Sequence, residues 1–173
     1  MGVFILDNKE IEICKGEPLY IRIEGKVVGK QRARVVRRGG KSITYTPGGT
    51  SVWEEQIQWQ SLEQKRSPLW DEPLAIKMWF VLSKPKTVKR FWPSVKPDYD
   101  NLEKSITDAL EKIIYTNDSR IVRSEFLKMY GEPERAEIVV YTLDDVIPDF
   151  WLPPSMQNQH LKEVSKYKKI EQG

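Results

Sequence analysis

The sequence is poor in the residues that many enzymes use as metal ligands and nucleophilic pairs. Its 173 residues include one cysteine, Cys14, and one histidine, His160. A single cysteine excludes a disulfide within the chain, and this pair cannot form a zinc site built from cysteine and histidine. It also leaves no Cys-His or Ser-His-Asp chemistry, unless His160 were the base. Any acid–base or metal chemistry is therefore expected to use Asp, Glu, Lys or Tyr.

Long apolar runs are also lacking. No stretch approaches the ~20 apolar residues that a membrane-spanning helix needs. The opening MGVFILDNKEIEIC lacks the basic and apolar regions of a signal peptide. A charged fraction of 31% and a hydrophobic fraction of 39% fit a globular protein. These features predict a cytoplasmic protein with no membrane partner.

Positive charge is concentrated in two segments without acids, although the net charge is only +3. The basic residues of the first segment are Lys26, Lys30, Arg32, Arg34, Arg37, Arg38 and Lys41. Those of the second are Lys84, Lys86, Lys89, Arg90 and Lys96. Such segments suit a polyanion, because each neutralised phosphate releases condensed counterions. Either segment alone is as readily a solvated loop, but the two flank an acidic cluster, which favours DNA binding.

Local patterns predict several strands. Alternating or continuous apolar residues predict strands at 19–25, 74–82, 121–130 and 135–143. The last two are expected to pair as a hairpin through Gly131-Glu132-Pro133. A basic hairpin or flexible loop is expected around a turn at 37–41, which contains Gly39 and Gly40.

Two helices are predicted. The first is expected to be capped by Thr50 or Ser51 and to end near Pro68, with apolar marks at Val52, Ile57, Trp59 and Leu62. The second follows Asp100 or Asn101 as cap, because apolar residues recur at helical spacing at Leu102, Ile106, Ala109, Leu110 and Ile113. Together these elements predict a single α+β domain, with a mixed or antiparallel sheet and two main helices. Residues 144–173 are expected to be a C-terminal extension that is either helical or disordered.

The densest chemical signal lies at the start of the second helix. If Asp98 and Asp100 are extended, their side chains point the same way, and the turn at Asp118 can bring back a third carboxylate. Such oxygen ligands suit Mg²⁺, which is usually held by few carboxylates and completed by substrate phosphate. Two such ions ~4 Å apart can activate a water for in-line attack on a phosphodiester. Lys104 could then stabilise charge on the phosphate.

A simpler interpretation of the same residues stays open. Asp and Asn before an apolar-periodic run are ordinary helix caps. Asp100, Lys104 and Asp108 fall opposite the apolar stripe, where an Asp-Lys pair is commonly a solvated surface pair worth ~0.3–0.5 kcal/mol. The flanking basic segments favour metal chemistry, because carboxylates cannot bind DNA without cations, and both interpretations stay open.

Two pairs of aromatic residues also have alternative interpretations. Phe91 and Trp92 lie in the second basic segment, where an aromatic side chain can stack on an unpaired base. They could equally be a hydrophobic anchor that holds the loop to the domain. Trp53 and Trp59 of the first predicted helix could belong to the core or to a dimer interface.

In their order along the chain, these motifs resemble the RusA-type Holliday junction resolvases, small dimeric Mg²⁺-dependent endonucleases of bacteria and their phages. The resemblance covers roughly residues 20–143. Its strongest parts are KPDYDNLEK at 96–104, DAL at 108–110 and IYTNDSRI at 114–121. GKQRAR at 29–34 and TYTP at 44–47 resemble the basic N-terminal loop of that family and the lead into its first helix. The resemblance implies an endonuclease domain at 1–143 and extension at 144–173, in a bacterial cell or phage-infected host.

The resemblance also implies roles for single residues. Asp98, Asp100 and Asp118 would be the catalytic carboxylates that bind Mg²⁺, and Lys104 a catalytic lysine near the scissile phosphate. Asp108 matches a recurrent acidic position of less certain role. The residues expected to bind DNA are Lys30, Arg32, Arg34, Arg37, Arg38, Lys41, Lys89, Arg90 and Lys96.

The expected substrate is a four-way junction or related branched DNA. A homodimer would place two active sites on two opposing strands, matching the two-fold symmetry of protein and DNA. The rival hypothesis is a protein that binds junctions without cutting them.

Two departures from the family pattern bear on the site. This chain has Asn117-Asp118 where two aspartates are frequent, and it has Glu111-Lys112 where Asn-Gly is frequent.

Overall fold

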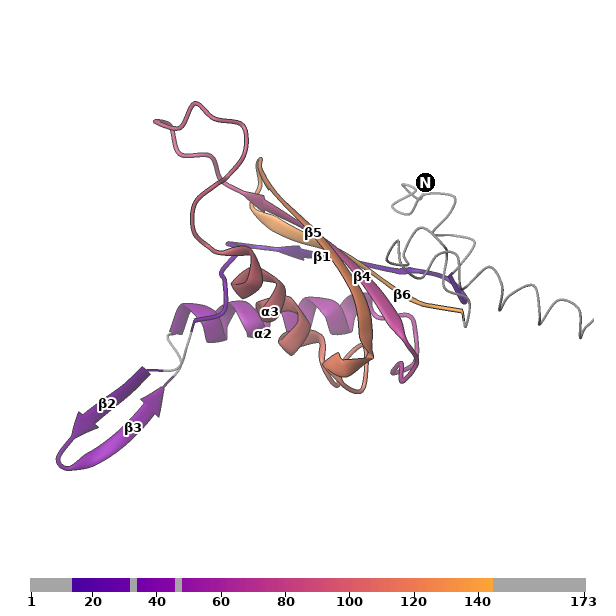
Figure 1. Ribbon diagram of the computed structural model, residues 1–173, viewed down its shortest axis with the longest axis horizontal. Helices are drawn as coiled ribbons and strands as arrows, with labels where there is room; N and C mark the ends of the chain where they lie inside the picture. Colours follow the sequence, from indigo (N-terminus) through magenta and orange to yellow (C-terminus); the bar gives the residue numbers. More distant parts are fainter. Residues whose placement is uncertain (1–13, 32–33, 46–47, 145–173) are drawn as a thin grey trace, which may run out of the picture. The chain divides into compact units, whose positions relative to one another are not determined.

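A computed structural model describes residues 14–31, 34–45 and 48–144 (Figure 1). Its compact unit, Gly16–Thr142, carries the helices and strands that lie within these described residues. The strands are β1 (Leu19–Glu24), β2 (Arg34–Arg38), β3 (Lys41–Tyr45), β4 (Leu74–Leu82), β5 (Ile121–Tyr130) and β6 (Arg135–Thr142). The helices are α2 (Gly48–Gln64), α3 (Tyr99–Leu110) and the 3₁₀ turn η1 (Asp118–Arg120).

The main sheet is mixed and has the strand order β1-β6-β4-β5. β4 pairs with β5 in parallel and with β6 in antiparallel, while β1 pairs with β6 in antiparallel. Figure 1 shows α2 and α3 on the same face of this sheet. The α+β architecture with a mixed sheet and two main helices is therefore confirmed.

The predicted hairpin between the last two strands is wrong, because β4 lies between β5 and β6. The crossover through α3 places β5 parallel to β4, and the chain must then pass over the end of β4 to reach its other side. Gly131 makes this passage possible: its N–H donates to the carbonyl of Leu82 at 3.0 Å. A Cβ at this position would lie 2.8 Å from Cγ1 of Val81. Two extended runs with a short connection thus flank a third strand instead of pairing with each other.

The core lies between the sheet and the two helices. β4 supplies Ile76, Met78 and Phe80, each at most 1% exposed. α3 buries the predicted apolar stripe, whose helical members are Leu102, Ile106, Ala109 and Leu110. The apolar pattern of α3 therefore predicted its buried face correctly.

The first helix differs from its prediction at both its start and its buried face. α2 begins at Gly48, so Thr50 and Ser51 lie in its first turn and are not its cap. Its buried positions are Thr50, Trp53, Ile57 and Ser61. Of the predicted apolar marks only Ile57 is buried, whereas Val52, Trp59 and Leu62 are 56%, 69% and 51% exposed. The structure thus assigns Trp53 to the core and Trp59 to the surface.

The basic hairpin is confirmed. β2 and β3 pair in antiparallel and form a two-stranded sheet of their own. Gly39 and Gly40 connect them with φ angles of 58° and 74°. A two-residue turn with two positive φ angles matches the right-handed twist of the strands, and glycine adopts it without steric cost.

No helix in the described ranges has the length and apolar character to cross a membrane. Residues 145–173 lie outside the described part of the chain, and so do residues 1–13. The division into a domain at 1–143 and an extension at 144–173 therefore stays a prediction.

Candidate active site

The candidate site begins where α3 begins. Asp98 is the N-cap, with φ −70° and ψ 150°, and its carbonyl accepts from the N–H of Leu102 at 3.1 Å. The prediction that Asp100 or Asn101 caps this helix is therefore wrong by two or three positions. Asp100 lies inside the first helical turn, so it does not continue an extended strand with Asp98. The free N–H groups of this turn favour negative charge.

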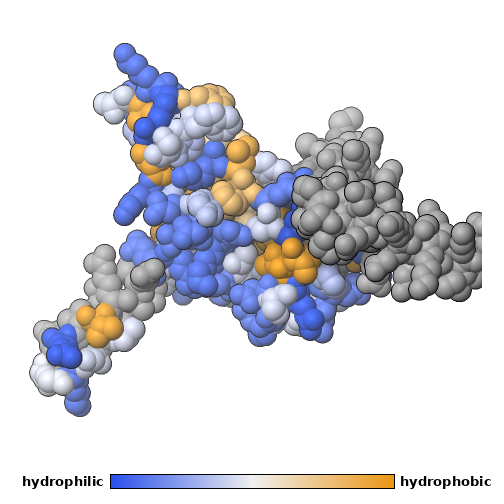
Figure 2. All heavy atoms as spheres, in the orientation of Figure 1, coloured by the Kyte–Doolittle hydropathy of each residue, from blue (hydrophilic) through white to orange (hydrophobic). Residues whose placement is uncertain are grey.

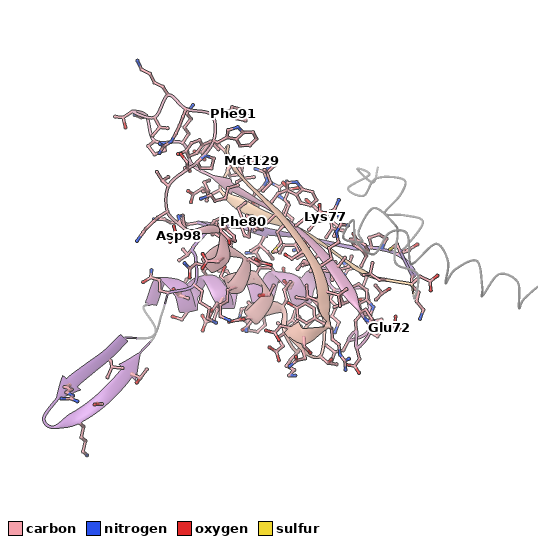
Figure 3. All side chains as sticks on the ribbon, viewed as in Figure 1. Glu72, Lys77, Phe80, Phe91, Asp98 and Met129 are labelled. Carbon is pink, nitrogen blue, oxygen red and sulfur yellow. The ribbon has the colours of Figure 1, made fainter. Side chains whose placement is uncertain are left out.

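One face of α3 and the chain that follows η1 line a pocket of about 460 Å³. The helix contributes Asp100, Glu103, Lys104, Thr107 and Asp108, and the returning chain contributes Asp118, Ile121, Val122, Arg123 and Ser124. Residues three and four apart on a helix share a face, which explains the helical half of the lining. The structure thus brings Asp100, Lys104 and Asp118 of the predicted site together. Asp98 is not among the described residues that line this pocket, and Figure 3 shows it at the start of α3.

Asp118 is placed by a short, well-connected turn. Asn117 caps η1, because its side-chain oxygen accepts from the N–H of Ser119 at 3.0 Å. Arg120 donates to Asp71 Oδ1 at 2.9 Å, and the hydroxyl of Thr116 donates to the same oxygen. The Thr116 hydrogen bond, followed by the charge of Arg120, lowers the pKa of Asp71. Asn117 therefore holds the turn that presents Asp118.

Asp108 forms ion pairs with two lysines of the protein. Its carboxylate lies 2.5 Å from Lys30 Nζ and 3.6 Å from Lys104 Nζ. Lys30 also lies 3.1 Å from Glu54 of α2. Burial lowers the pKa of Lys30, but its hydrogen bonds to Asp108 and Glu54 outweigh this effect, so the net pKa is raised. Asp108 is thus engaged by two lysines, while the pocket also offers the carboxylates of Asp100 and Asp118.

The donor set of the pocket fits a hard divalent cation. Asp100, Asp118 and Glu103 offer carboxylate oxygens, which Mg²⁺ and Mn²⁺ prefer over nitrogen or sulfur. Within the described ranges, no three His, Cys, Asp or Glu side chains are grouped closely enough to hold a metal ion by themselves. Magnesium needs only one or two carboxylates when substrate phosphate and water complete its shell. The residues present therefore fit a metal that binds together with DNA.

The predicted DNA-binding residues fall into three groups. Lys89, Arg90 and Lys96 are exposed on the segment between β4 and α3, and Arg37 and Lys41 are exposed on the hairpin. The side chains of Arg34 and Arg38 lie outside what the structure describes, as does Arg32 altogether. Lys30 is different, because its ammonium is paired with two carboxylates. We assign it to the packing of α2 and α3.

Sequence reasoning gave no role to several residues of the pocket. Glu103 and Thr107 share the helical face of Asp100, so the spacing of α3 was a signal that could have found them. Arg123 and Ser124 could not be found in this way, because only the crossover places the start of β5 beside α3.

Comparison with known proteins identifies the family of the chain. Residues 24–141 match the family described as Endodeoxyribonuclease RusA. The chain belongs to this family. It is therefore an endodeoxyribonuclease, and the resemblance noted in the sequence is confirmed.

Two relatives of this RusA-family chain span most of its folded part. A protein of Lactococcus phage r1t, named crossover junction endodeoxyribonuclease rusA, is 30% identical over 114 residues, covering 64% of this chain and 86% of the relative. The uncharacterized protein YqaN of Bacillus subtilis (strain 168) is 25% identical over 130 residues, covering 68% of this chain and 92% of the relative. The family and the phage relative support junction-resolving nuclease activity for the RusA-family chain.

Proposed function

We propose that this chain resolves four-way and related branched DNA by Mg²⁺-dependent hydrolysis of the phosphodiester backbone, with Asp98, Asp100 and Asp118 as metal-binding carboxylates. The observation that supports this most is the shared pocket of Asp100 and Asp118, which are 18 positions apart in the sequence but line one concave surface beside Lys104. Asp98 stands two residues before Asp100, at the cap of the same helix.

When bound, the metal lowers the pKa of a water and neutralises charge on the phosphate. The protein orients the reacting groups. Asp100 and Asp118 hold their oxygens toward the pocket, and Asp98 places a further carboxylate at the helix N-terminus. The water oxygen gives up a proton to solvent as it bonds to phosphorus, a backbone P–O bond breaks, and the leaving oxygen takes up a proton from solvent.

Lys104 is proposed to stabilise the charge that develops on the phosphate. Its side chain is 61% exposed, and Asp108, one helical turn further on, lies 3.6 Å from its ammonium. This partner holds the cation on the pocket side of α3 and leaves its remaining N–H donors available. A positioned cation of this kind acts mainly on the transition state.

We further propose a homodimer. A four-way junction presents two equivalent strands to be cut, and two identical subunits related by a two-fold axis place one active site on each. α2 supports this proposal, because its outward face carries the exposed apolar side chains of Val52, Trp59 and Leu62.

The decisive experiment incubates the chain with an end-labelled four-way junction, first with Mg²⁺ and then with EDTA. We expect paired nicks that require the metal. Asp100→Asn and Asp118→Asn should each lower the cutting rate roughly a thousandfold, because several kcal/mol of transition-state stabilisation disappear. Both variants should still bind the junction in EDTA.

Glu17→Gln is the matched control, since Glu17 is an exposed carboxylate before β1, outside the pocket and away from α2. It should cut at the wild-type rate. If the wild type binds the junction tightly but makes no nicks with Mg²⁺ or Mn²⁺, the rival hypothesis of a binding protein without catalysis would replace this proposal. Cutting retained by Asp100→Asn would remove that residue from the site.

A further inference from the structure

The segment between β4 and α3 combines positive charge with large apolar side chains. Residues 83–97, which we call the aromatic–basic loop, contain no acid. Its five cations are Lys84, Lys86, Lys89, Arg90 and Lys96. The loop ends directly before Asp98, and Figure 2 shows hydrophilic and hydrophobic side chains next to each other on its surface. Its chemistry therefore suits a partner that carries both phosphates and flat apolar groups.

The loop is held to the domain by its returning half. Lys128 of β5 donates to the carbonyl of Val95 at 2.8 Å and to that of Pro97 at 3.0 Å. Pro93 is buried. A Cβ at Gly29 would lie 3.0 Å from Cβ of Pro97, so the basic N-terminal segment packs closely against the same end of the loop. These contacts fix the part of the loop that leads into the candidate site.

The aromatic residues are not what holds the loop. Phe91 is 71% exposed and Trp92 is 54% exposed. Their rings meet edge to face, with centroids 4.7 Å apart and planes at 87°, and Figure 3 shows Phe91 on the loop that precedes Asp98. Because Pro93 and the Lys128 hydrogen bonds anchor the loop, the interpretation of Phe91 and Trp92 as the hydrophobic anchor fails. Two rings remain presented to a partner.

We propose that the aromatic–basic loop is a base-stacking element, in which Phe91 and Trp92 stack on bases unpaired at the branch point and the surrounding cations hold the adjacent phosphates. This inference rests on the proposed function, because it takes branched DNA as the ligand. Stacking on an aromatic side chain is available to every base, since each has a π-face, whereas the cations contribute through counterion release.

The branch point is the favoured target because its bases are less completely stacked than those of duplex DNA. In a continuous duplex both faces of each base are covered by its neighbours, and exposing one costs a few kcal/mol. A base next to a strand exchange has already lost part of this stacking. The two rings should therefore strengthen binding to branched DNA and add little to binding of duplex DNA.

The test measures binding without cutting, in EDTA, by fluorescence anisotropy on a four-way junction and on a duplex of equal length. The variant Phe91→Ala/Trp92→Ala is expected to bind the junction at least about tenfold more weakly, as the loss of one or two stacked bases predicts. Its affinity for the duplex should change less than about twofold. The slope of junction affinity against salt should stay as in the wild type, because the rings carry no charge.

Three further variants separate stacking from fold and charge. Phe91→Tyr/Trp92→Phe keeps two rings and should restore junction affinity. Leu69→Ala removes an exposed apolar side chain elsewhere, 43% exposed in the wild type, and should leave it unchanged. Lys89→Ala/Arg90→Ala should reduce the salt slope by about two on junction and duplex alike.

A 2-aminopurine at the branch point gives a direct signal, because its fluorescence changes when an aromatic ring stacks on it. The wild type should change this fluorescence, and Phe91→Ala/Trp92→Ala should not. An equal loss of affinity on junction and duplex, or no loss on either, would overturn the inference. So would ring-dependent sedimentation with anionic phospholipid vesicles and no ring-dependent junction binding, because the loop would then bind lipid.

Together with the Mg²⁺ cutting assay of the proposed function, these binding data distinguish this inference from that function. If the wild type never cuts but shows ring-dependent junction binding, catalysis is refuted and the stacking element stands. If the wild type cuts with Mg²⁺ and Phe91→Ala/Trp92→Ala binds the junction as tightly, the stacking element is refuted and catalysis stands.

Discussion

Lys112 is the described non-glycine residue with a positive φ angle, 64°, and it directly follows Glu111, the C-cap of α3. Its N–H donates to the carbonyl of Tyr115 at 2.7 Å, which closes the turn before Asp118. A side chain in this left-handed region costs about 1–2 kcal/mol. Asn-Gly, frequent here in the resembled family, would avoid most of that cost. The chain keeps the turn because the hydrogen bonds around it require this geometry.

Replacing this lysine tests the strain directly. Lys112→Gly should leave the free energy of unfolding unchanged or raise it by up to about 1 kcal/mol, because relief of strain exceeds the entropy that glycine loses on folding. Lys112→Val should lower it by about 1–2 kcal/mol, since a β-branched residue tolerates positive φ poorly. Urea denaturation measures both. A loss above about 1 kcal/mol in Lys112→Gly would show that the contact of the lysine side chain with the carbonyl of Thr116 matters more than the backbone.

At the scale of residues, the sequence predicted the helical half of the site better than the returning half. The spacing of Asp100, Lys104 and Asp108 follows from helix geometry, and all three line the pocket. The turn at Asp118 suggested a third carboxylate, but its place beside α3 could not be derived from the sequence, because it depends on the crossover. The exact cap of α3 was missed because Asp98, Asp100 and Asn101 are all good capping residues.

At the scale of elements, Lys30 connects α2 and α3. It reaches Glu54 on one helix and Asp108 on the other, and its backbone N–H donates to the carbonyl of Asn101 at 2.7 Å. Its side chain is 29% exposed and those of both partners 24%. A cation shared by two partly buried carboxylates on neighbouring helices holds those helices in register, and it also fixes the acid that pairs with Lys104.

Lys30→Met keeps most of the side-chain volume and removes the charge. We expect it to lower the free energy of unfolding by about 1–3 kcal/mol, because Glu54 and Asp108 then share no cation. Since the pKa of Lys30 is raised above its ordinary 10.5, this stabilisation is fully present below that pH and is lost as the pH rises through the raised value. Thermal or urea unfolding at pH 8 and at increasing pH above 10.5 would show the difference shrinking.

Arg37→Ala is the matched comparison, because Arg37 is an exposed cation of the hairpin. It should leave the stability within about 0.5 kcal/mol of the wild type and reduce the salt slope of DNA binding by about one. Lys30→Met should lower the stability and leave the salt slope of DNA binding unchanged. If Lys30→Met reduced the salt slope by one and left stability unchanged, Lys30 would bind phosphate, as the sequence suggested.

Two elements show why sequence patterns stop short of the fold. α2 has apolar side chains on opposite faces, with Trp53 and Ile57 inward and Val52 and Trp59 outward, so its pattern does not single out the buried face. The face of α3 was predictable because its outward positions are polar or charged. The order of β5 and β6 was not predictable, because strand pairing across a third strand leaves no local signal.

At the scale of the whole molecule, the outward face of α2 matters because a lone domain gains nothing from exposing it. Trp59 is the most exposed of the large apolar side chains on this helix, at 69%. Tryptophan is among the residues that most often dominate the affinity of protein interfaces. If two copies pack through this face, one mutation there should separate them without unfolding either.

Trp59→Asp is therefore expected to weaken dimerisation at least about thirtyfold, which corresponds to the loss of about 2 kcal/mol at a central interface residue. Sedimentation equilibrium of the wild type should give a dimer, and that of Trp59→Asp a monomer at the same concentration. Leu127→Asp on the edge strand β5, 39% exposed in the wild type, is the comparison and should leave the dimer intact. A monomeric variant should still nick one strand of a junction but should no longer make paired cuts within one binding event, because the second active site is gone. A dimer that survives Trp59→Asp and dissociates in Leu127→Asp would move the interface from α2 to the edge of the sheet.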